Sequence, residues 1–413
     1  MAGGFGTRIR EIDNTVPKPL IKIAGVPILQ RQLDVLSKNG IKDVIIVVSY
    51  MADKIMDYFK SAYRDIKIGY YVEKEPLGSG GALFKIEKFD DDFFLINGDL
   101  VFDMDLKRMM EFHKKHKALV TLAVHPNNHP YDSSVLVMDN NNRIVKWYDK
   151  SEQKPRYYQN LVNAGIHIIN PKILETKPSK EKLNLDKDIL SKLVNDALLG
   201  YKTTEYIKDA GTPDRFYKIE SDIKKGKVEA RNINNKQKAI FLDRDGTINK
   251  HVGFITRPEQ LELIDSAAKA IKIINEAGYL AILITNQPVI ARGEVTHEGL
   301  REIHNKLETL LGEEGAYLDA IYYCPHHPDC GFEGEIKELK IDCDCRKPKP
   351  GMILKAAEDY NIDLKESWMI GDSVADVLCG ERAGCKIGFI GEETRDVNIE
   401  GKDLLSIINA IFE

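Results

Sequence analysis

Short apolar runs rich in β-branched residues alternate with amphipathic stretches along most of the chain. Two clear amphipathic stretches cover residues 28–38 and 266–276, where apolar positions recur at helical spacing. Strands that alternate with helices in this way predict an α/β fold with largely parallel sheets. The runs expected to form strands are residues 42–50, 66–74, 91–98, 118–126, 162–170, 239–246, 280–287, 320–327, 367–373 and 386–391.

A polar stretch near the middle divides the chain. Hydrophobicity falls around residues 224–238, where charged residues and Asn dominate, as is typical of segments that join domains. The 413 residues are too many for one ordinary core, since domains average about 150 residues. We therefore predict two doubly wound, Rossmann-like domains over residues 1–223 and 237–413, joined by a linker over residues 224–236.

Composition restricts the expected partners to small molecules. A formal net charge of −5 argues against non-specific binding to nucleic acid or anionic membranes, because both need concentrated Lys and Arg. The chain has no run of about 20 apolar residues and no N-terminal signal pattern. These features predict a cytoplasmic protein.

The first residues are rich in glycine. Gly3, Gly4 and Gly6 leave room for backbone N–H groups to approach a phosphate, and Arg8 and Lys18 can neutralise its charge. A tight turn at the start of a helix would explain the same glycines. Such a loop normally follows a buried strand, but only two residues precede it here, so we expect the native start to lie a few residues upstream.

Further motifs follow in a fixed order: PKPL at 17–20, EPLGSGGAL at 75–83, INGD at 96–99, VNAG at 162–165 and KDAGT at 208–212. This set resembles the sugar-1-phosphate nucleotidyltransferases over roughly residues 1–222, and most closely the heptose- and mannose-1-phosphate guanylyltransferases. Asp149 stands where that family has Glu. The resemblance implies that Gly3, Gly4, Gly6, Thr7, Glu75, Gly80 and Gly81 contact the nucleotide, Arg8 and Lys18 its phosphates, Asp99 and Asp209 a Mg²⁺ ion, and Lys150 and Asn163 the sugar phosphate.

Two aspartates of this half suit nucleotidyl transfer chemically. Attack of a sugar phosphate on an α-phosphorus brings two anions together, so catalysis consists mainly of neutralisation and alignment. Asp99 follows an apolar strand, although a turn would also explain an Asp after Asn-Gly. A helix cap is the rival explanation for Asp209, and a surface turn is the rival for Glu75, Gly80 and Gly81.

A sharper motif begins the second half. Asp243 and Asp245 end the apolar run AIFLDRDG, so one carboxylate can attack phosphorus while the other donates a proton to the leaving oxygen. The motif resembles that of the haloacid-dehalogenase (HAD) phosphatases, and the family's other motifs follow in order. The resemblance implies that Thr285 and Lys347 hold the phosphoryl group, and that Mg²⁺ is bound by Asp243, Asp372 and the backbone carbonyl of Asp245, with Asp376 behind.

Cysteine and histidine gather between these motifs. Cys324 and His326 are two residues apart, as are Cys343 and Cys345, and such a set suits a structural, tetrahedral Zn²⁺ site. His327 and Cys330 are competing ligands, and a loop of free thiols is the alternative. Cys379 and Cys385 are expected to pack in the interior.

The cysteine loop indicates which HAD phosphatases the second half resembles most. Over residues 237–395 the chain is similar to the heptose 1,7-bisphosphate 7-phosphatases and the related histidinol-phosphate phosphatases. The resemblance implies that Arg346, Asn286, Gln287 and residues 251–254 contact the substrate, although Pro288 replaces the usual Ser.

The pairing of the two halves indicates consecutive reactions. We predict that the second half removes the 7-phosphate of a heptose 1,7-bisphosphate and that the first half transfers a nucleotidyl group, from GTP, to the remaining 1-phosphate. One rival is a hexose-1-phosphate nucleotidyltransferase joined to another phosphatase, such as a histidinol phosphatase. Another rival makes the first half a non-catalytic sensor of nucleotide sugars.

Overall fold

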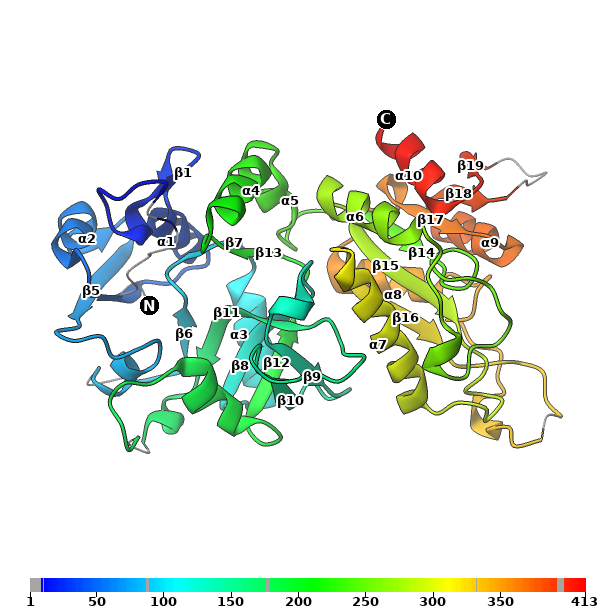
Figure 1. Ribbon diagram of the computed structural model, residues 1–413, viewed down its shortest axis with the longest axis horizontal. Coiled ribbons are helices and arrows are strands. Elements are labelled where there is room, and N and C mark those ends of the chain that lie inside the picture. The colour runs from blue at the N-terminus through cyan, green and yellow to red at the C-terminus, as the bar shows by residue number, and fades with distance from the viewer. Residues whose placement is uncertain (1–8, 10, 87–88, 176–177, 332, 392–396) are drawn as a thin grey trace. The chain divides into compact units, whose positions relative to one another are not determined.

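The computed structural model describes residues 9, 11–86, 89–175, 178–331, 333–391 and 397–413 (Figure 1). Its contacts divide the chain into two compact units. The first contains residues 1–124, 136–149 and 163–232, and the second contains residues 125–135, 150–162 and 233–413. The predicted linker includes a short helix, α5 (Lys227–Ala230), and the predicted domain boundaries stay a prediction. None of the described helices is long and apolar enough to cross a membrane.

The second unit is built on a six-stranded parallel sheet with strand order β16-β15-β14-β17-β18-β19. The chain starts in the middle of the sheet at β14 and adds strands first on one side and then on the other. This is a doubly wound arrangement, in which ligands bind beyond the carboxyl ends of the strands. The strands are β14 (Ala239–Leu242), β15 (Leu280–Asn286), β16 (Ala320–Cys324), β17 (Trp368–Gly371), β18 (Lys386–Ile390) and β19 (Ile399–Gly401).

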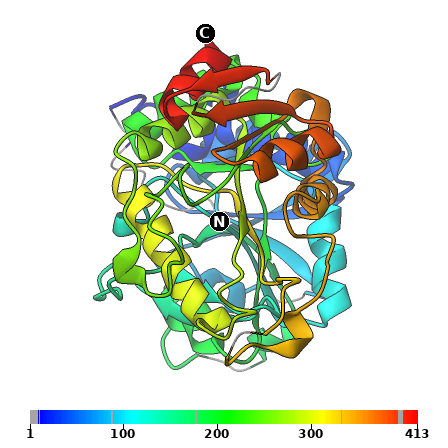
Figure 2. The ribbon, with the colours of Figure 1, turned by 90° about the vertical axis from the view of Figure 1, so that its right-hand side faces the viewer.

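Helices cover both faces of this sheet. Ile240 and Leu242 of β14 pack with α6 (Ala267–Ala277), α7 (His297–Glu313) and α10 (Leu404–Phe412). Ala239 and Phe241 face the other way, toward α8 (Gly351–Tyr360) and α9 (Val374–Ala383). Figure 2 shows α10 in red and α7 in yellow from the side of this unit. Because both faces of β14 are buried, its sequence is continuously apolar until Asp243.

The first unit contains a mixed four-stranded sheet, order β12-β8-β11-β6, and a three-stranded sheet, order β3-β5-β4. Helix α1 (Ile28–Lys38) buries Leu29, Leu33 and Leu36 against this core. The strands are β3 (Asp43–Val48), β4 (Ala62–Tyr63), β5 (Ile66–Val72), β6 (Phe93–Ile96), β8 (Val120–His125), β11 (Val162–Ile169) and β12 (Leu198–Lys202). The other helices are α2 (Ala52–Phe59), α3 (Leu106–His116) and α4 (Pro213–Lys224).

Three strand pairs complete the first unit. The antiparallel pair β7 (Leu100–Asp103) and β13 (Tyr206–Asp209) bears most directly on function. The others are β1 (Lys22–Ile23) with β2 (Val26–Pro27), and β9 (Val135–Met138) with β10 (Ile144–Tyr148). Within the described residues, no strand joins β3 to β6, and each of these two strands pairs along one edge. The strand expected upstream of the glycine-rich loop stays a prediction.

The hydrophobic pattern located the main elements. All ten predicted runs contain a strand, from β3 to β18. The two amphipathic stretches are helices α1 and α6, and Ser266 is the residue before α6. The predicted α/β class is confirmed.

Candidate functional site

The HAD motifs meet at one edge of the sheet in the second unit. Asp243 directly follows β14, Asp372 directly follows β17, and Thr285 lies next to the end of β15. These three strands are neighbours, so their carboxyl ends bring residues from distant parts of the sequence together. Asp243 and Thr285 are buried, at 8% and 1% exposure.

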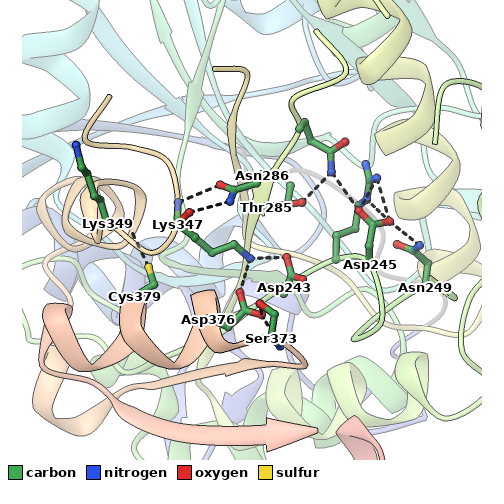
Figure 3. A network of polar contacts seen from close by, with 12 residues as sticks. Asp243, Asp245, Asn249, Thr285, Asn286, Lys347, Lys349, Ser373, Asp376 and Cys379 are labelled. Carbon is green, nitrogen blue, oxygen red and sulfur yellow. Dashed lines mark hydrogen bonds and ion pairs between the residues drawn. The ribbon is translucent and has the colours of Figure 1, made fainter. Parts of the chain in front are cut away.

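A buried lysine links two of the carboxylates. The Lys347 Nζ lies 2.5 Å from Asp243 Oδ1 and 2.6 Å from Asp376 Oδ1 (Figure 3). Burial raises the pKa of Asp243 to about 7, and the charge of Asp376 adds to this, while the Lys347 ammonium opposes it. Burial alone would lower the pKa of Lys347, but the charges of Asp243 and Asp376 outweigh burial and raise it. Lys347 therefore remains a cation.

The same edge has the ligands for a hard divalent cation. Oxygen atoms of Asp243, Asp372 and Asp376 lie within 4.8 Å of one another. Asp376 also accepts hydrogen bonds from the N–H and the hydroxyl of Ser373, at 3.1 and 2.6 Å. Both oxygens of Asp376 are engaged, Oδ1 by Lys347 and Oδ2 by Ser373, whereas Lys347 contacts Asp243 at Oδ1. Asp243 and Asp372 would therefore supply the carboxylate ligands to Mg²⁺, which prefers oxygen. The carboxylate of Asp245 is outside this group.

Gly246 makes room for Asp372. Its φ is +89°, a conformation that L side chains rarely adopt. A Cβ atom there would lie 1.9 Å from Asp372 Oδ2. The glycine of the DRDGT motif is thus required both by its backbone conformation and by the place of the Asp372 carboxylate.

Asp245 is held by a separate set of donors. Arg244 Nη2 lies 2.8 Å from Asp245 Oδ2, and Nε lies 3.2 Å from Oδ1. Asn249 Nδ2 donates to Asp245 Oδ1 at 2.9 Å, and Gln287 Nε2 donates to Oδ2 at 3.3 Å. Figure 3 shows the Asp245 carboxylate directed at Asn249, while that of Asp243 is directed at Lys347. Sequence reasoning did not single out Arg244 or Asn249, although both lie within the DRDGTIN motif.

Residues predicted to contact substrate also bind protein groups. Asn286 Oδ1 accepts from Lys347 N at 3.0 Å, and its Nδ2 donates to Lys347 O at 3.1 Å. Gln287 Nε2 also donates to Thr285 Oγ1 at 2.8 Å. Arg346 Nη1 donates to the carbonyl of His326 at 3.2 Å. Asn286 and Gln287 therefore hold together the segments that contain the predicted catalytic residues, and their contact with substrate stays a prediction.

The four predicted zinc ligands form one cluster. Cys324, His326, Cys343 and Cys345 offer ligand atoms within 4.8 Å of one another. The Sγ atoms of Cys343 and Cys345 are 3.2 Å apart, and His326 Nδ1 is 3.3 Å from Cys345 Sγ. A hydrogen bond with Cys324 is the main cause that lowers the pKa of Cys345, to about 5. Since thiolate is the form that binds metal, the donor set fits Zn²⁺.

The competing ligands lie outside the cluster. His327 Nδ1 accepts a hydrogen bond from the N–H of Asp329 at 3.1 Å. Cys330 is exposed, and its thiol faces the carbonyl of Pro328. Cys379 is buried as expected, whereas Cys385 is only partly buried.

Asp99 directly precedes β7, and Asp209 is the last residue of the neighbouring strand β13. Asp209 pairs with Leu100 in the β13–β7 ladder, and the N–H of Ala210 donates to the carbonyl of Asp99 at 2.8 Å. Lys18 Nζ lies 2.7 Å from Asp99 Oδ2, across 81 residues of sequence. The structure thus places Lys18 against the carboxylate of Asp99, and the backbone of Asp209 beside that of Asp99. Their binding of Mg²⁺ stays a prediction.

Asp209 does not cap the helix that follows it. Thr212 is the N-cap residue of α4, and its side chain accepts from the N–H of Arg215. The capping explanation for Asp209 is therefore wrong. Arg215 Nη1 instead lies 2.8 and 2.7 Å from the two carboxylate oxygens of Asp209, a contact that sequence reasoning missed.

The second glycine-rich segment packs against a distant part of the same unit. The N–H of Gly80 donates to the carbonyl of Leu183 at 3.0 Å. A Cβ at Gly78 would lie 2.3 Å from the carbonyl oxygen of Leu183, and one at Gly81 would lie 2.3 Å from that of Glu181. Close packing therefore explains these glycines, while the predicted contact with a base stays a prediction. Glu75 is exposed.

The predicted sugar contacts lie near further polar groups. Asn163 Nδ2 donates to Asp186 Oδ1 at 3.2 Å, and its Oδ1 accepts from the N–H of Gly165 at 3.0 Å. The N–H of Lys150 donates to Ser134 Oγ at 3.1 Å. Asp149 pairs with Lys187 at 3.2 Å. The predicted residues Gly3, Gly4, Gly6, Thr7 and Arg8 lie outside the described residues.

Comparison with known proteins assigns each half of the chain to a family. The family model described as nucleotidyl transferase matches residues 1–226, and one described as HAD-hydrolase-like matches residues 344–397. The D-glycero-β-D-manno-heptose-1,7-bisphosphate 7-phosphatase of Pasteurella multocida is 41% identical over 166 residues, which are 40% of this chain and 88% of that protein. The first half belongs to the nucleotidyl transferase family, and the second belongs with the heptose bisphosphate phosphatases.

Two other proteins also match parts of this chain. The α-anomer phosphatase of Photorhabdus laumondii is 42% identical over 156 residues, which are 38% of this chain and 83% of that protein. The solved structure of HddC from Yersinia pseudotuberculosis is 28% identical and covers 54% of this chain and 96% of that one, with a TM-score of 0.47.

A chain with a nucleotidyl transferase domain and a HAD phosphatase domain is an enzyme with two reaction centres. The phosphatase half places Lys347 between the carboxylates of Asp243 and Asp376 at a sheet edge. The nucleotidyl transferase half places Lys18 beside the carboxylate of Asp99. Both arrangements suit phosphoryl chemistry, in which cations offset the charge of crowded oxygens.

Proposed function

We propose that the chain catalyses two consecutive steps in the synthesis of a nucleotide-activated heptose. The phosphatase domain hydrolyses the 7-phosphate of D-glycero-D-manno-heptose 1,7-bisphosphate. The nucleotidyl transferase domain then transfers GMP from GTP to the heptose 1-phosphate. The observation that carries the proposal is the buried Lys347 ammonium, which lies between Asp243 and Asp376 on the sheet edge that also bears Thr285.

The phosphatase residues divide the chemistry among them. A carboxylate oxygen of Asp243 attacks phosphorus and the ester bond to the sugar oxygen breaks, while Asp245 gives that oxygen a proton. Water then gives a proton to the Asp245 carboxylate and attacks the phosphorus of the aspartyl phosphate, and the bond from phosphorus to the Asp243 oxygen breaks to release inorganic phosphate. Lys347 and Thr285 hold the phosphoryl oxygens in both steps. Mg²⁺ bound by Asp243, Asp372 and the backbone carbonyl of Asp245 would add further positive charge at those oxygens.

The nucleotidyl transferase residues act mainly by alignment. An oxygen of the sugar 1-phosphate attacks the α-phosphorus of the nucleotide, and pyrophosphate leaves. Lys18, with Arg8, neutralises the phosphates. Asp99 and Asp209 would hold a Mg²⁺ ion, whose charge would reduce the repulsion between the phosphates. Asn163 and Lys150 contact the sugar phosphate, and residues 75–81 contact the nucleotide.

The two reactions fit one chain because the product of the phosphatase is the substrate of the nucleotidyl transferase. Phosphatase relatives named for the β-anomer and for the α-anomer both resemble this chain, so that half agrees with a bisphosphate of either anomer. Histidinol phosphate gives no such connection. A tether between the two domains raises the local concentration of the shared intermediate.

The test offers heptose 1,7-bisphosphate with each nucleoside triphosphate to the purified protein and identifies products by mass. We expect inorganic phosphate, pyrophosphate and a GDP-heptose. Asp243→Asn should abolish phosphate release, and Asp99→Asn should abolish pyrophosphate release from heptose 1-phosphate while phosphate release continues. Phosphate release that survives Asp243→Asn would refute the assigned nucleophile. A wild-type protein that forms no pyrophosphate with any triphosphate would favour the rival hypothesis, in which the first half is a non-catalytic sensor of nucleotide sugars.

A further inference from the structure

Arg244 is a buried cation whose guanidinium is committed to its neighbour in the sequence. Its side chain is 1% exposed. Two of its nitrogens contact the Asp245 carboxylate, with Nη2 at 2.8 and 3.0 Å from the two oxygens and Nε at 3.2 Å from Oδ1. Burying a guanidinium is costly unless it is paired, so this contact is a defined part of the site.

Two buried cations divide the acidic groups at the sheet edge between them. Lys347 contacts Asp243 and Asp376, whereas Arg244 contacts Asp245. The oxygen atoms of Asp243 and Asp376 belong to the candidate cation site, and those of Asp245 do not. Asp245 follows Asp243 by only two residues, so without Arg244 only neutral donors would oppose the turning of its carboxylate toward Lys347 or toward a bound Mg²⁺.

Neutral donors complete the support of Asp245. Asn249 Nδ2 and Gln287 Nε2 both donate to its carboxylate. The same Gln287 nitrogen also donates to Thr285 Oγ1, which ties the orientation of Asp245 to a residue assigned to hold the phosphoryl group. The carboxylate is thus fixed by three side chains, and Arg244 is the one that carries charge.

We propose that Arg244 is a positioning residue for the hydrolysis of phosphate esters. Arg244 keeps the Asp245 carboxyl group away from the cluster of Asp243, Asp372 and Asp376. It also orients that carboxyl group to donate a proton to the leaving oxygen of the substrate. Arg244 acts through Asp245, because Nε and Nη2 of its buried guanidinium contact that carboxylate, while Nη1 has no hydrogen-bond partner among the described residues. The inference rests on the proposed phosphatase activity and adds to it a residue that aligns the proton donor.

The first test compares leaving groups. An alkyl phosphate needs a proton on its leaving oxygen, while p-nitrophenyl phosphate releases a stable anion that needs none. General acid catalysis contributes roughly 100-fold or more, so Arg244→Gln should lose about that factor in kcat for the alkyl ester. It should lose less than about threefold for p-nitrophenyl phosphate, with KM little changed for both. Arg244→Lys, which keeps the charge, should recover part of the loss. Arg257→Gln, at an exposed arginine of the same unit, is the matched control.

The second test is a double-mutant cycle. If Arg244 acts through Asp245, adding Arg244→Gln to Asp245→Asn should change kcat for the alkyl ester by less than about twofold. A further tenfold loss in the double variant, or an equal loss for both leaving groups in the single variant, would overturn the proposal. Should Arg244→Gln fail to fold, Arg244→Lys is tested in the same cycle.

These results can be separated from the proposed substrate. A wild-type protein that hydrolyses p-nitrophenyl phosphate and glycerol phosphate but not heptose 1,7-bisphosphate would refute the assigned substrate. The role of Arg244 would still be decided by the glycerol phosphate measurements, which contain the same alkyl leaving group.

Discussion

Replacing Gly246 with Ala should weaken Mg²⁺ binding more than it weakens the fold. Gly246 and Gly384 both have a left-handed backbone, with φ of +89° and +83°. An alanine at either position costs about 1–2 kcal/mol for that conformation. The surroundings differ, because a Cβ at 246 would lie 1.9 Å from Asp372 Oδ2, whereas one at 384 would have no atom within 4 Å. The Asp372 carboxylate lies at the end of its side chain, so in Gly246→Ala it should turn away from the added Cβ and leave the cation site.

The measurements compare both variants with wild type. Unfolding should show similar losses in the two variants, because the backbone cost is shared. Phosphate release as a function of Mg²⁺ concentration should separate them. We expect the half-saturating concentration to rise roughly 10–100-fold in Gly246→Ala, the range found when the support of a metal ligand is lost. Gly384→Ala should resemble wild type. Equal Mg²⁺ dependence in both variants would refute the assignment of Asp372 as a ligand.

Three further predictions concern the cysteine cluster, the buried Lys347 and the buried His304. Cys345→Ser should remove bound zinc, measured by elemental analysis, and destabilise the phosphatase unit, whereas Cys330→Ser should keep its zinc. Lys347→Met should lower the free energy of unfolding in Mg²⁺-free buffer by about 3–5 kcal/mol, because two buried carboxylates lose their cation; a loss below about 1 kcal/mol would contradict the ion pairs. Burial lowers the pKa of His304 to about 3, so the unfolded chain binds the proton first as pH falls. Wild type should therefore lose stability relative to His304→Gln by about 1.4 kcal/mol per pH unit between about pH 6.5 and 3 in denaturant titrations, and a constant difference would refute this.

Strands were predictable where burial makes the sequence uniform. The run of β14 is apolar throughout because both faces of the strand are covered, so its sequence alone identifies it. Nine of the described strands lie outside the predicted runs, among them β7, β12 and β13. These three contain only four or five residues each, and β13 ends in Lys208 and Asp209, so a local pattern gives little signal.

The motifs identified the candidate site because its residues follow strands that end at one sheet edge. Their partners could not be derived in the same way. Asn286 brackets the backbone of Lys347 from 61 residues away, and Lys18 reaches Asp99 across 81 residues. Thr212 and Asp209 are both good capping residues by type, so only the backbone conformation decides between them.

The packing of Gly78 and Gly81 on Leu183 and Glu181 has a practical consequence for re-engineering this segment, which we propose contacts the nucleotide. A chimera with the glycine-rich loop of another transferase, but with Glu181 and Leu183 of this chain retained, would place side chains of the new loop too close to the backbone of those two residues. The two segments should be transplanted as one cassette, even though a hundred residues separate them along the chain.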